Sequence, residues 1–361
     1  MVALSGFRAF LKRKNIEISL RRYGIDALGA MAQGLFCSLL IGTILNTLGS
    51  QTGVAIFSTV GGYATAVSGP AMAVAIGYAL KCPPLVLFSM VPVGWAANAL
   101  GGSAGGPLAV FVIAIVAAEV GKMVSKETPV DVLVTPLVTI FAGVALAALI
   151  APPIGAGANY VGALIKRATV LQPFWMGIIV SASVGIALTL PISSAAICHS
   201  FNLVGLAGGA AVAGCCANMV GFAVMSFREN RWGGLVSQGL GTSMLHMGNI
   251  VKNPRIWLPA ILTSMITGPI ATCVFKLEMN GAAINSGMGT CGLCGPIGVW
   301  TGWVNPSDVA LADGAAAIAP GAMDWLGLAL VCFVLPAVIC WALGLFFRRI
   351  GWIRDGDLKL D

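Results

Sequence analysis

Long apolar stretches are the feature of this chain that most limits how it can fold. Apolar runs of 17 or more residues recur between Ala27 and Phe347. Each run is long enough to cross a hydrocarbon layer of ~30 Å as a helix. A chain inside lipid must pair its own backbone groups, so repeated runs of this kind predict a helical bundle, and the alternation typical of a β-barrel is absent. With 58% hydrophobic and 9% charged residues, the sequence predicts an all-α polytopic membrane protein.

Proline and glycine divide the apolar runs into candidate spans. In the first half we expect spans near residues 27–48, 52–68, 70–92, 105–122 and 132–153. In the second half we expect them near residues 173–191, 203–226, 256–276 and 325–347. Two segments, 233–249 and 287–299, are too short or too broken to cross simply, and they are predicted to be re-entrant hairpins. Chain length and the placement of charges predict about ten transmembrane helices.

Basic residues mark both ends of the chain, which carries a net charge of +7. Residues 1–25 form a basic arm and residues 348–361 a basic tail. An excess of Lys and Arg stays on the cytoplasmic side, so both termini are expected there. The arm is interpreted as an interfacial helix lying on anionic lipid rather than as a nucleic-acid-binding segment. It is too long and too charged for the start of a signal peptide.

A short segment in the middle of the chain separates two halves. Residues 154–172 are apolar except for Lys166 and Arg167 and a few polar positions. We interpret them as an amphipathic connector between residues 26–153 and residues 173–347. The alternative is a further span whose charged side chains extend to the interface.

The richest polar cluster lies between residues 241 and 255. Polar solutes need donors and acceptors held in an otherwise apolar pocket, and four side chains of this cluster are candidates to supply them: Thr242, Ser243, His246 and Asn249. Its two cations, Lys252 and Arg255, are alternatively topology charges at the cytoplasmic surface.

A second cluster surrounds Glu278, which follows the apolar run 256–275. Insertion scales put the cost of a charged side chain at the bilayer centre at roughly 2.5–3.5 kcal/mol, so such a group is a candidate for function. Asn280 and Thr290 accompany it in glycine-rich sequence, where backbone groups can approach a ligand closely. The competing interpretation is a structural ion pair between Glu278 and Lys276.

Other candidate sites are weaker. His199 lies in a kinked, hydroxyl-rich segment and is either a solute ligand or an ordinary interface residue. Cys291 and Cys294 have the spacing of a metal or redox pair, but no second such pair accompanies them, so packing in a tight turn is favoured. We expect no metal, no cofactor and no catalytic residue in this chain, and its status as an enzyme stays open.

Three motifs resemble a known family. Gly-Thr-Ser-Met-Leu-His-Met-Gly-Asn-Ile-Val-Lys-Asn-Pro-Arg-Ile-Trp-Leu-Pro (241–259), Gly-Pro-Ile-Ala-Thr-Cys-Val-Phe-Lys-Leu-Glu (268–278) and Gly-Met-Gly-Thr-Cys-Gly-Leu-Cys-Gly-Pro-Ile-Gly (287–298) are similar to the second type of phosphotransferase-system EIIC-like membrane proteins. That group includes perfringolysin regulators. The resemblance covers almost the whole chain.

The resemblance implies a fold and a site. It implies a bacterial inner-membrane homodimer like the glucose superfamily of EIIC proteins, with about ten helices, two re-entrant hairpins and an amphipathic connector. Residues 26–153 would form the dimeric scaffold, and residues 173–347 the half that binds and carries the solute. A glutamate and a histidine bind the sugar in that superfamily, and Glu278 and His246 match them by position. Met279 departs from the proline that commonly follows the glutamate.

These expectations lead to a predicted function. The leading hypothesis is a permease that translocates a small polar solute, a sugar or a related compound, by an elevator-type mechanism. No EIIA or EIIB domain and no phosphocysteine motif occurs in the sequence, so these partners would be separate proteins. Two rival hypotheses are a membrane sensor or regulator without transport, and an ion-coupled secondary carrier that is independent of phosphotransfer.

Overall fold

The computed structural model describes residues 9–360, and within them the chain folds into helices joined by short turns. Its extended segments contribute one isolated bridge, between Gly205 and Met279. Among the described residues, six helices are long and apolar enough to cross a membrane, or seven if one bent pair counts as a single span. The prediction of an all-α polytopic membrane protein is therefore confirmed. The number of about ten spans and the re-entrant nature of two segments stay predictions.

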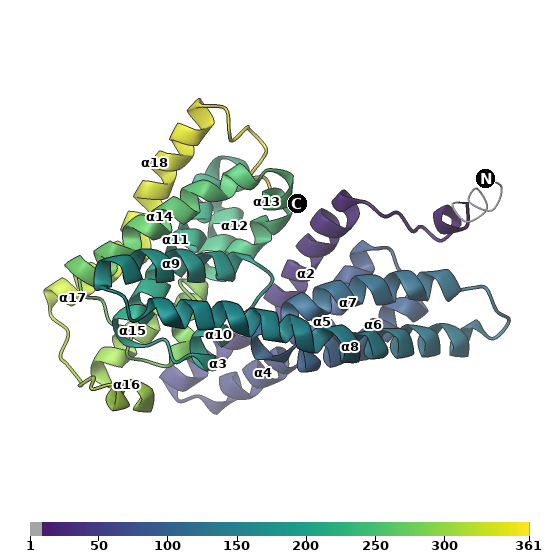
Figure 1. Ribbon diagram of the computed structural model, residues 1–361, viewed down its shortest axis with the longest axis horizontal. Coiled ribbons are helices and arrows are strands. Elements are labelled where there is room, and N and C mark those ends of the chain that lie inside the picture. Colours follow the sequence, from purple (N-terminus) through teal and green to yellow (C-terminus); the bar gives the residue numbers. More distant parts are fainter. Residues whose placement is uncertain (1–8, 361) are drawn as a thin grey trace. The chain divides into compact units, whose positions relative to one another are not determined.

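The contacts divide the chain into two compact units, Met1–Gly157 and Ala158–Asp361. The helices of the first unit are η1 (Arg22–Ala27), α2 (Leu28–Leu35), η2 (Phe36–Leu40), α3 (Ile41–Thr52), α4 (Ala55–Ala66), α5 (Ser68–Ala79), α6 (Pro84–Leu100), α7 (Gly102–Val124) and α8 (Asp131–Ala168), which continues into the second unit. Helix α5 packs against α2, α6 and α7, while α3 packs against α4 (Figure 1). Helices η1 to α3 form one continuous apolar run from Arg22 to Thr52.

The expected span 70–92 is wrong, because the chain turns within it. Helix α5 ends at Ala79, and α6 begins at Pro84 and packs back against α5. Proline at the first position of a helix is preorganised to start it, and the residue before a proline avoids helical geometry. The pair Pro83-Pro84 therefore ends one helix and begins the next. A bend of 51° between α4 and α5 adds a second break that the sequence had placed near residue 69.

Helix α8 is longer than any expected span. It contains 38 residues, which corresponds to about 57 Å. The helix continues through Pro152 and Pro153, so the expected boundary between a span ending at residue 153 and a connector beginning at residue 154 is not a break in the helix. The connector itself and the halves on either side of it stay predictions.

The second unit is built around α11. Its helices are α9 (Pro173–Thr189), α10 (Ser194–Ser200), α11 (Gly205–Met225), α12 (Phe227–Val236), η3 (Ser237–Gly241), η4 (Ser243–His246), α13 (Met247–Lys252), η5 (Pro254–Trp257), α14 (Leu258–Pro269), η6 (Ile270–Val274), η7 (Ala283–Gly287), η8 (Cys291–Leu293), α15 (Cys294–Val304), α16 (Asp308–Ala312), α17 (Ala322–Ala329), η9 (Leu330–Val334) and α18 (Leu335–Arg349). Helices α9, α14 and α18 pack around α11, nearly all of which is buried (Figure 1).

Small residues make this close packing possible. A Cβ atom at Gly214 of α11 would collide with the backbone of Ser181 on α9, and one at Gly268 of α14 would collide with the backbone of Gly177. Helices in lipid associate through such close backbone contacts because no hydrophobic force separates them from the lipid tails. The glycine-rich composition of α11 therefore makes it the centre of the unit.

The two segments predicted to be re-entrant hairpins meet on α11. Element η3 of the first segment contacts η8 of the second and packs against α11, and the second segment meets α11 at Gly289. Gly289, with a φ of +54°, presses its backbone against Cys215 and Cys216. A side chain at position 289 would be both strained and excluded by α11, which explains the glycine.

The C-terminal segment, residues 350–360, folds back over the first of these segments. The Asn230 side chain donates to the Leu358 carbonyl at 2.7 Å and accepts from the Leu360 N–H. Asn253 donates to the Trp352 carbonyl at 3.0 Å and to the Asp357 carboxylate at 2.8 Å. These amides hold the segment in place through three backbone groups and the Asp357 side chain.

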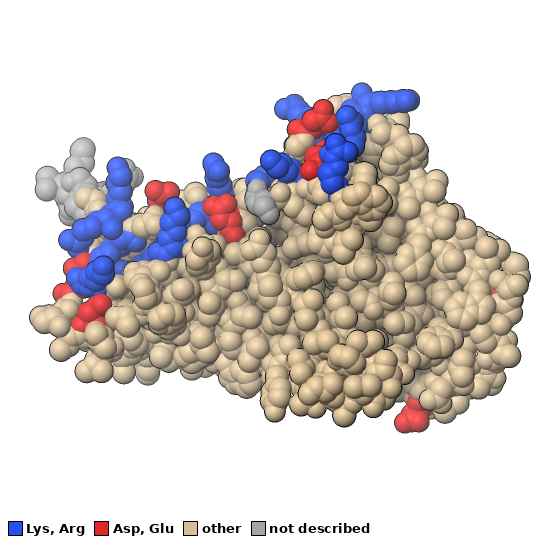
Figure 2. Space-filling view, turned by 180° about the vertical axis from the view of Figure 1, so that it is seen from behind, with Lys and Arg blue, Asp and Glu red and all other residues tan. Residues whose placement is uncertain are grey.

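Charges gather at one end of each unit, considered separately (Figure 2). In the first unit every described Lys and Arg lies in residues 9–22, in the α5–α6 turn, or at the end of α7 and the loop that follows it. In the second unit Arg348 pairs with Glu229 at 2.7 Å, and Arg255 lies over the Trp352 ring. Helix α16, which begins at Asp308, lies at the opposite end of the second unit (Figure 1), and Asp313, which follows it, lines a cavity together with Lys166.

Candidate substrate site

A buried network of hydroxyl and amide groups crosses the core of the second unit. The Asn218 side chain of α11 donates to Ser264 Oγ on α14 at 3.0 Å and accepts from Thr189 Oγ1 on α9 at 3.3 Å. Thr189 Oγ1 lies 2.8 Å from Ser243 Oγ, and Trp257 Nε1 donates to Asn218 Oδ1 at 3.1 Å. The network therefore ties the predicted site residue Ser243 to three helices. Asn218, Thr189, Ser243 and Ser264 are each fully buried.

His246 lies one turn further along the same segment and is fully buried against Phe222, with 4.8 Å between ring centroids. Its Nδ1 lies 3.2 Å from Asn249 Nδ2. The same amide nitrogen donates to the Lys359 carbonyl at 2.8 Å, which fixes the orientation of the amide. An amide nitrogen can only donate, so His246 Nδ1 accepts and the neutral ring carries its proton on Nε2.

That Nε2 atom has no hydrogen-bond partner among residues 9–360. A buried donor without an acceptor costs about 1–3 kcal/mol. Gln238, on the adjacent element η3, has a second unpartnered atom, its buried Oε1, while its Nε2 donates to Ser226 Oγ at 3.0 Å. The segment 237–249 therefore buries one free donor, His246 Nε2–H, and one free acceptor, Gln238 Oε1. A hydroxyl group of a solute can accept from the first or donate to the second.

Two other predicted residues have local roles. Thr242 caps η4, since its Oγ1 accepts from the Met244 N–H at 3.2 Å. Thr290 is fully buried, and its hydroxyl donates to Met219 Sδ at 3.7 Å. Met219 lies one turn before Phe222 on α11, so Thr290 and His246 approach the same stretch of that helix from the two predicted hairpins.

Glu278 and Asn280 lie elsewhere in the unit. Asn280 donates to Glu278 Oε2 at 2.9 Å, and Met279 between them pairs with Gly205 at the start of α11. Leu277 lies against Gly209, and the 13 residues from there to Phe222 correspond to about 20 Å along α11. The structure therefore brings together Ser243, His246 and Asn249 but not Glu278. Glu278 is exposed within the unit, and it makes no ion pair with Lys276 among the described residues.

His199 is also apart from His246. It lies in the last turn of α10 and is exposed. Helix α10 packs against η7 through a hydrogen bond from Ser194 Oγ to the Gly287 carbonyl at 2.8 Å. His199 does not share in the buried network of α11.

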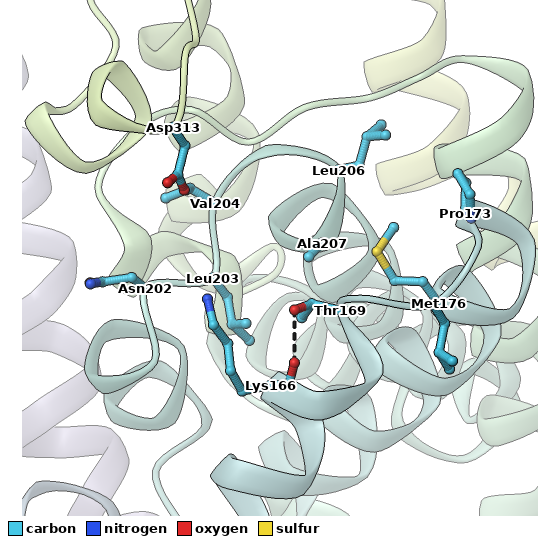
Figure 3. A pocket seen from close by; sticks show the side chains of 11 residues that line it. Lys166, Thr169, Pro173, Met176, Asn202, Leu203, Val204, Leu206, Ala207 and Asp313 are labelled. Atoms are coloured by element: carbon cyan, nitrogen blue, oxygen red, sulfur yellow. Dashed lines mark hydrogen bonds between the residues drawn. The ribbon is translucent and has the colours of Figure 1, made fainter.

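A cavity of about 320 Å³ opens at the Glu278 end of α11 (Figure 3). Lys166 at the end of α8 and Asp313 after α16 lie on opposite sides of it, with Asn202, Val204 and Ala207 between them. No local motif indicated this cavity, because its lining comes from three segments that are distant along the chain, residues 166–176, residues 202–207 and Asp313.

Sequence reasoning missed Asn218, Thr189 and Gln238. A signal for Asn218 was present, since it is the only amide in the apolar run 203–226, and a polar group in such a run is as informative as the charge of Glu278. No signal identified Thr189, because a threonine in a membrane helix usually bonds to its own backbone.

No group of three or more His, Cys, Asp or Glu side chains that could hold a metal ion occurs within residues 9–360. The family model described as "Phosphotransferase system, EIIC" matches residues 25–360. Neither the curated proteins nor the solved structures include a match.

Proposed function

This chain belongs to the phosphotransferase system EIIC family, and we propose that it is the membrane permease component through which a small polar solute, a sugar or a related compound, crosses the bilayer. The observation that carries the proposed solute site is the buried Nε2–H of His246, for which the described part of the chain supplies no acceptor. A solute hydroxyl can accept this hydrogen bond and remove the cost of the unpaired donor.

The neighbours of His246 support the same site. Asn249 holds the imidazole in the tautomer that donates from Nε2. Ser243 and Thr189 connect the segment to α9 and α11, so the ring is held on a rigid support. Thr242, Thr290, Asn280, Glu278 and His199 stay predicted solute ligands.

The two histidines of the chain give a matched test. We expect members of a panel of sugars, polyols and organic anions to raise the thermal unfolding temperature of the purified protein, and His246→Gln to remove the effect. His199→Gln changes the exposed imidazole outside the network, and an intact effect in this variant would remove His199 from the predicted solute ligands, whereas a lost effect would keep it among them. A solute that stabilises His246→Gln as well as the unaltered protein would exclude His246 as a ligand. In the same titration, unchanged binding by Glu278→Gln would remove Glu278 from the site.

We further propose that the transport step is an elevator-type motion of residues 173–347 against a dimeric scaffold of residues 26–153 in a bacterial inner membrane. The separation of contacts near Gly157 into two compact units supports the division into two halves. The family implies separate EIIA and EIIB partners. Uptake by reconstituted vesicles that requires phosphoenolpyruvate and these partners supports the phosphotransferase route. Uptake that collapses with an ion gradient supports a secondary carrier, and binding without uptake supports a sensor.

A further inference from the structure

A basic cavity lies at the charged end of the first unit, whereas the proposed solute site belongs to the second unit. It has a volume of about 370 Å³ and is bounded by the N-terminal segment, the α5–α6 turn and the α7–α8 loop. Its charged lining consists of Arg13, Lys14, Lys81, Lys122, Lys126 and Glu127. Five cations and one carboxylate around a space of this size form a site with a strong preference for anions.

Two of the cations that line the cavity, Lys14 and Lys122, are bound by neighbouring protein groups. Lys122 is 2% exposed, pairs with Glu119 at 2.7 Å, and donates to the backbone carbonyls of Asn15 and Leu80. Lys14 donates to the Ser125 carbonyl and pairs with Glu127. These contacts join the three segments that surround the cavity, so the cavity is part of the folded structure.

Two other cations, Lys81 and Lys126, are available to bind an anion. Lys81 and Lys126 line the cavity and make no ion pair or side-chain hydrogen bond among residues 9–360. The carboxylate of Glu127 is shared by Arg13 and Lys14 and does not offset these two lysines. Neither ammonium group has an ion-pair partner among residues 9–360, although the Asp131 carboxylate accepts from the Lys126 backbone N–H at 2.7 Å.

The backbone supplies an independent observation. Lys81 and Lys126 have φ values of +56° and +61°, and Asn15, which also lines the cavity, has a φ of +54°. Residues just after a helix end often adopt this left-handed conformation, but glycine or asparagine normally occupies it. The chain has lysine at two of these three positions despite the strain. Strain of this kind is concentrated at functional sites.

We infer that this cavity binds a phosphoryl anion, either the headgroup of an anionic phospholipid or free phosphate. A phosphoryl group offers several oxygens that can accept from separate donors, and lysine ammonium groups bind it as point charges. The cavity lies at the end of the unit where the cations gather, which is the end that faces anionic lipid headgroups if these cations are cytoplasmic. This inference is independent of the proposed solute site.

The glycine variant Lys81→Gly/Lys126→Gly tests the inference at two positions whose left-handed backbone glycine adopts without strain. It removes both free cations and relieves the left-handed strain, so we expect its thermal stability without ligand to equal or exceed that of the unaltered protein. Full-length protein in detergent is titrated with phosphatidylglycerol and, separately, with inorganic phosphate, and ligand-dependent thermal stabilisation is measured. Phosphatidylcholine and sodium chloride of equal ionic strength are the two reference additions. The variant should bind the effective anion more weakly by on the order of tenfold or more.

A charge-matched control separates the cavity from general attraction to a basic surface. Lys12→Gln/Arg21→Gln removes two exposed cations of the same N-terminal segment that do not line the cavity, and it should bind the anion as the unaltered protein does. An effect limited to phosphatidylglycerol identifies a lipid headgroup, and an effect of inorganic phosphate identifies a free anion. The inference is overturned if neither ligand stabilises the protein, if phosphatidylcholine acts equally, or if the glycine and control variants lose equal affinity.

Discussion

At the scale of single residues, Glu127 fastens the N-terminal segment to the rest of the first unit. Its carboxylate accepts from Arg13 at 2.7 Å and pairs with Lys14. The hydrogen bond from Lys14, with the charges of Lys14 and Arg13, lowers the pKa of Glu127 below its ordinary value of 4.5. The pair therefore favours the ionised carboxylate in the folded protein.

The sign of this shift predicts a pH dependence. A carboxyl group whose pKa is lower when folded contributes stability above its unfolded pKa, and the contribution is lost as the pH falls through the folded pKa. We expect residues 12–15 to stay attached at neutral pH and to open below the ordinary pKa of 4.5. Hydrogen–deuterium exchange of this segment, corrected for intrinsic rates, measures the opening.

Glu127→Gln provides the comparison for this prediction. The amide cannot ionise, so the segment should already exchange faster at neutral pH and should lose the added pH dependence. Equal exchange by both proteins at neutral pH would show that the carboxylate does not hold the segment.

At the scale of elements, the C-terminal segment supports the element that contains His246. Asn249 donates to the Lys359 backbone carbonyl, and Asn230 holds residues 358 and 360 through their backbone. Deleting residues 358–361 leaves the Asn249 amide without one acceptor, which costs about 1–3 kcal/mol for a buried group. We expect faster hydrogen exchange in residues 243–252 and a lower unfolding temperature.

Lys359→Ala is the matched control, because it keeps the carbonyl that Asn249 uses. It should exchange and unfold like the unaltered protein. If the alanine variant is as unstable as the deletion, the lysine side chain rather than the backbone contact is responsible.

Elements were predictable where a long apolar run meets no strong interruption. The expected spans 203–226 and 256–276 correspond closely to Gly205–Met225 and to the run Pro254–Val274. The turn at Pro83-Pro84 was not predicted. The sequence on both sides of it is apolar, and hydropathy alone does not show where a chain reverses its direction. The prolines of α8 had the opposite effect on the prediction. A span was expected to end at Pro153, but the helix continues through it, as a long helix in lipid can.

The candidate site was harder to predict than the elements. Ser243, His246 and Asn249 lie within seven residues, so their proximity followed from local sequence. The position of Glu278 depends on the pairing of Met279 with Gly205, which lie more than 70 residues apart. Composition carries no information about such a pairing, and only the fold separates Glu278 from His246.

At the scale of the whole molecule, the charges predict which end of each unit faces the cytoplasm. Lys126 belongs to the basic end of the first unit, whereas residues 313–320 follow α16, at the end of the second unit opposite α12 and α13 (Figure 1). A protease site placed in residues 126–130 should be cut in inside-out vesicles and protected in intact spheroplasts. A site in residues 313–320 should behave in the opposite way.

Detergent-solubilised protein controls for accessibility, and both sites should be cut there. Cleavage of both sites from the same face of intact membranes would contradict the orientation inferred from the cations.

The folded-back C-terminal segment has a practical consequence for purification. An affinity tag added after residue 361 begins three positions beyond Lys359, whose carbonyl accepts a hydrogen bond from the Asn249 amide that orients His246. Such a tag, or the resin that captures it, can displace the C-terminal segment and so disturb α13, whose Asn249 orients His246. Binding measurements on this protein are therefore better made with the tag at the N-terminus, or with a C-terminal tag that has been cleaved off first.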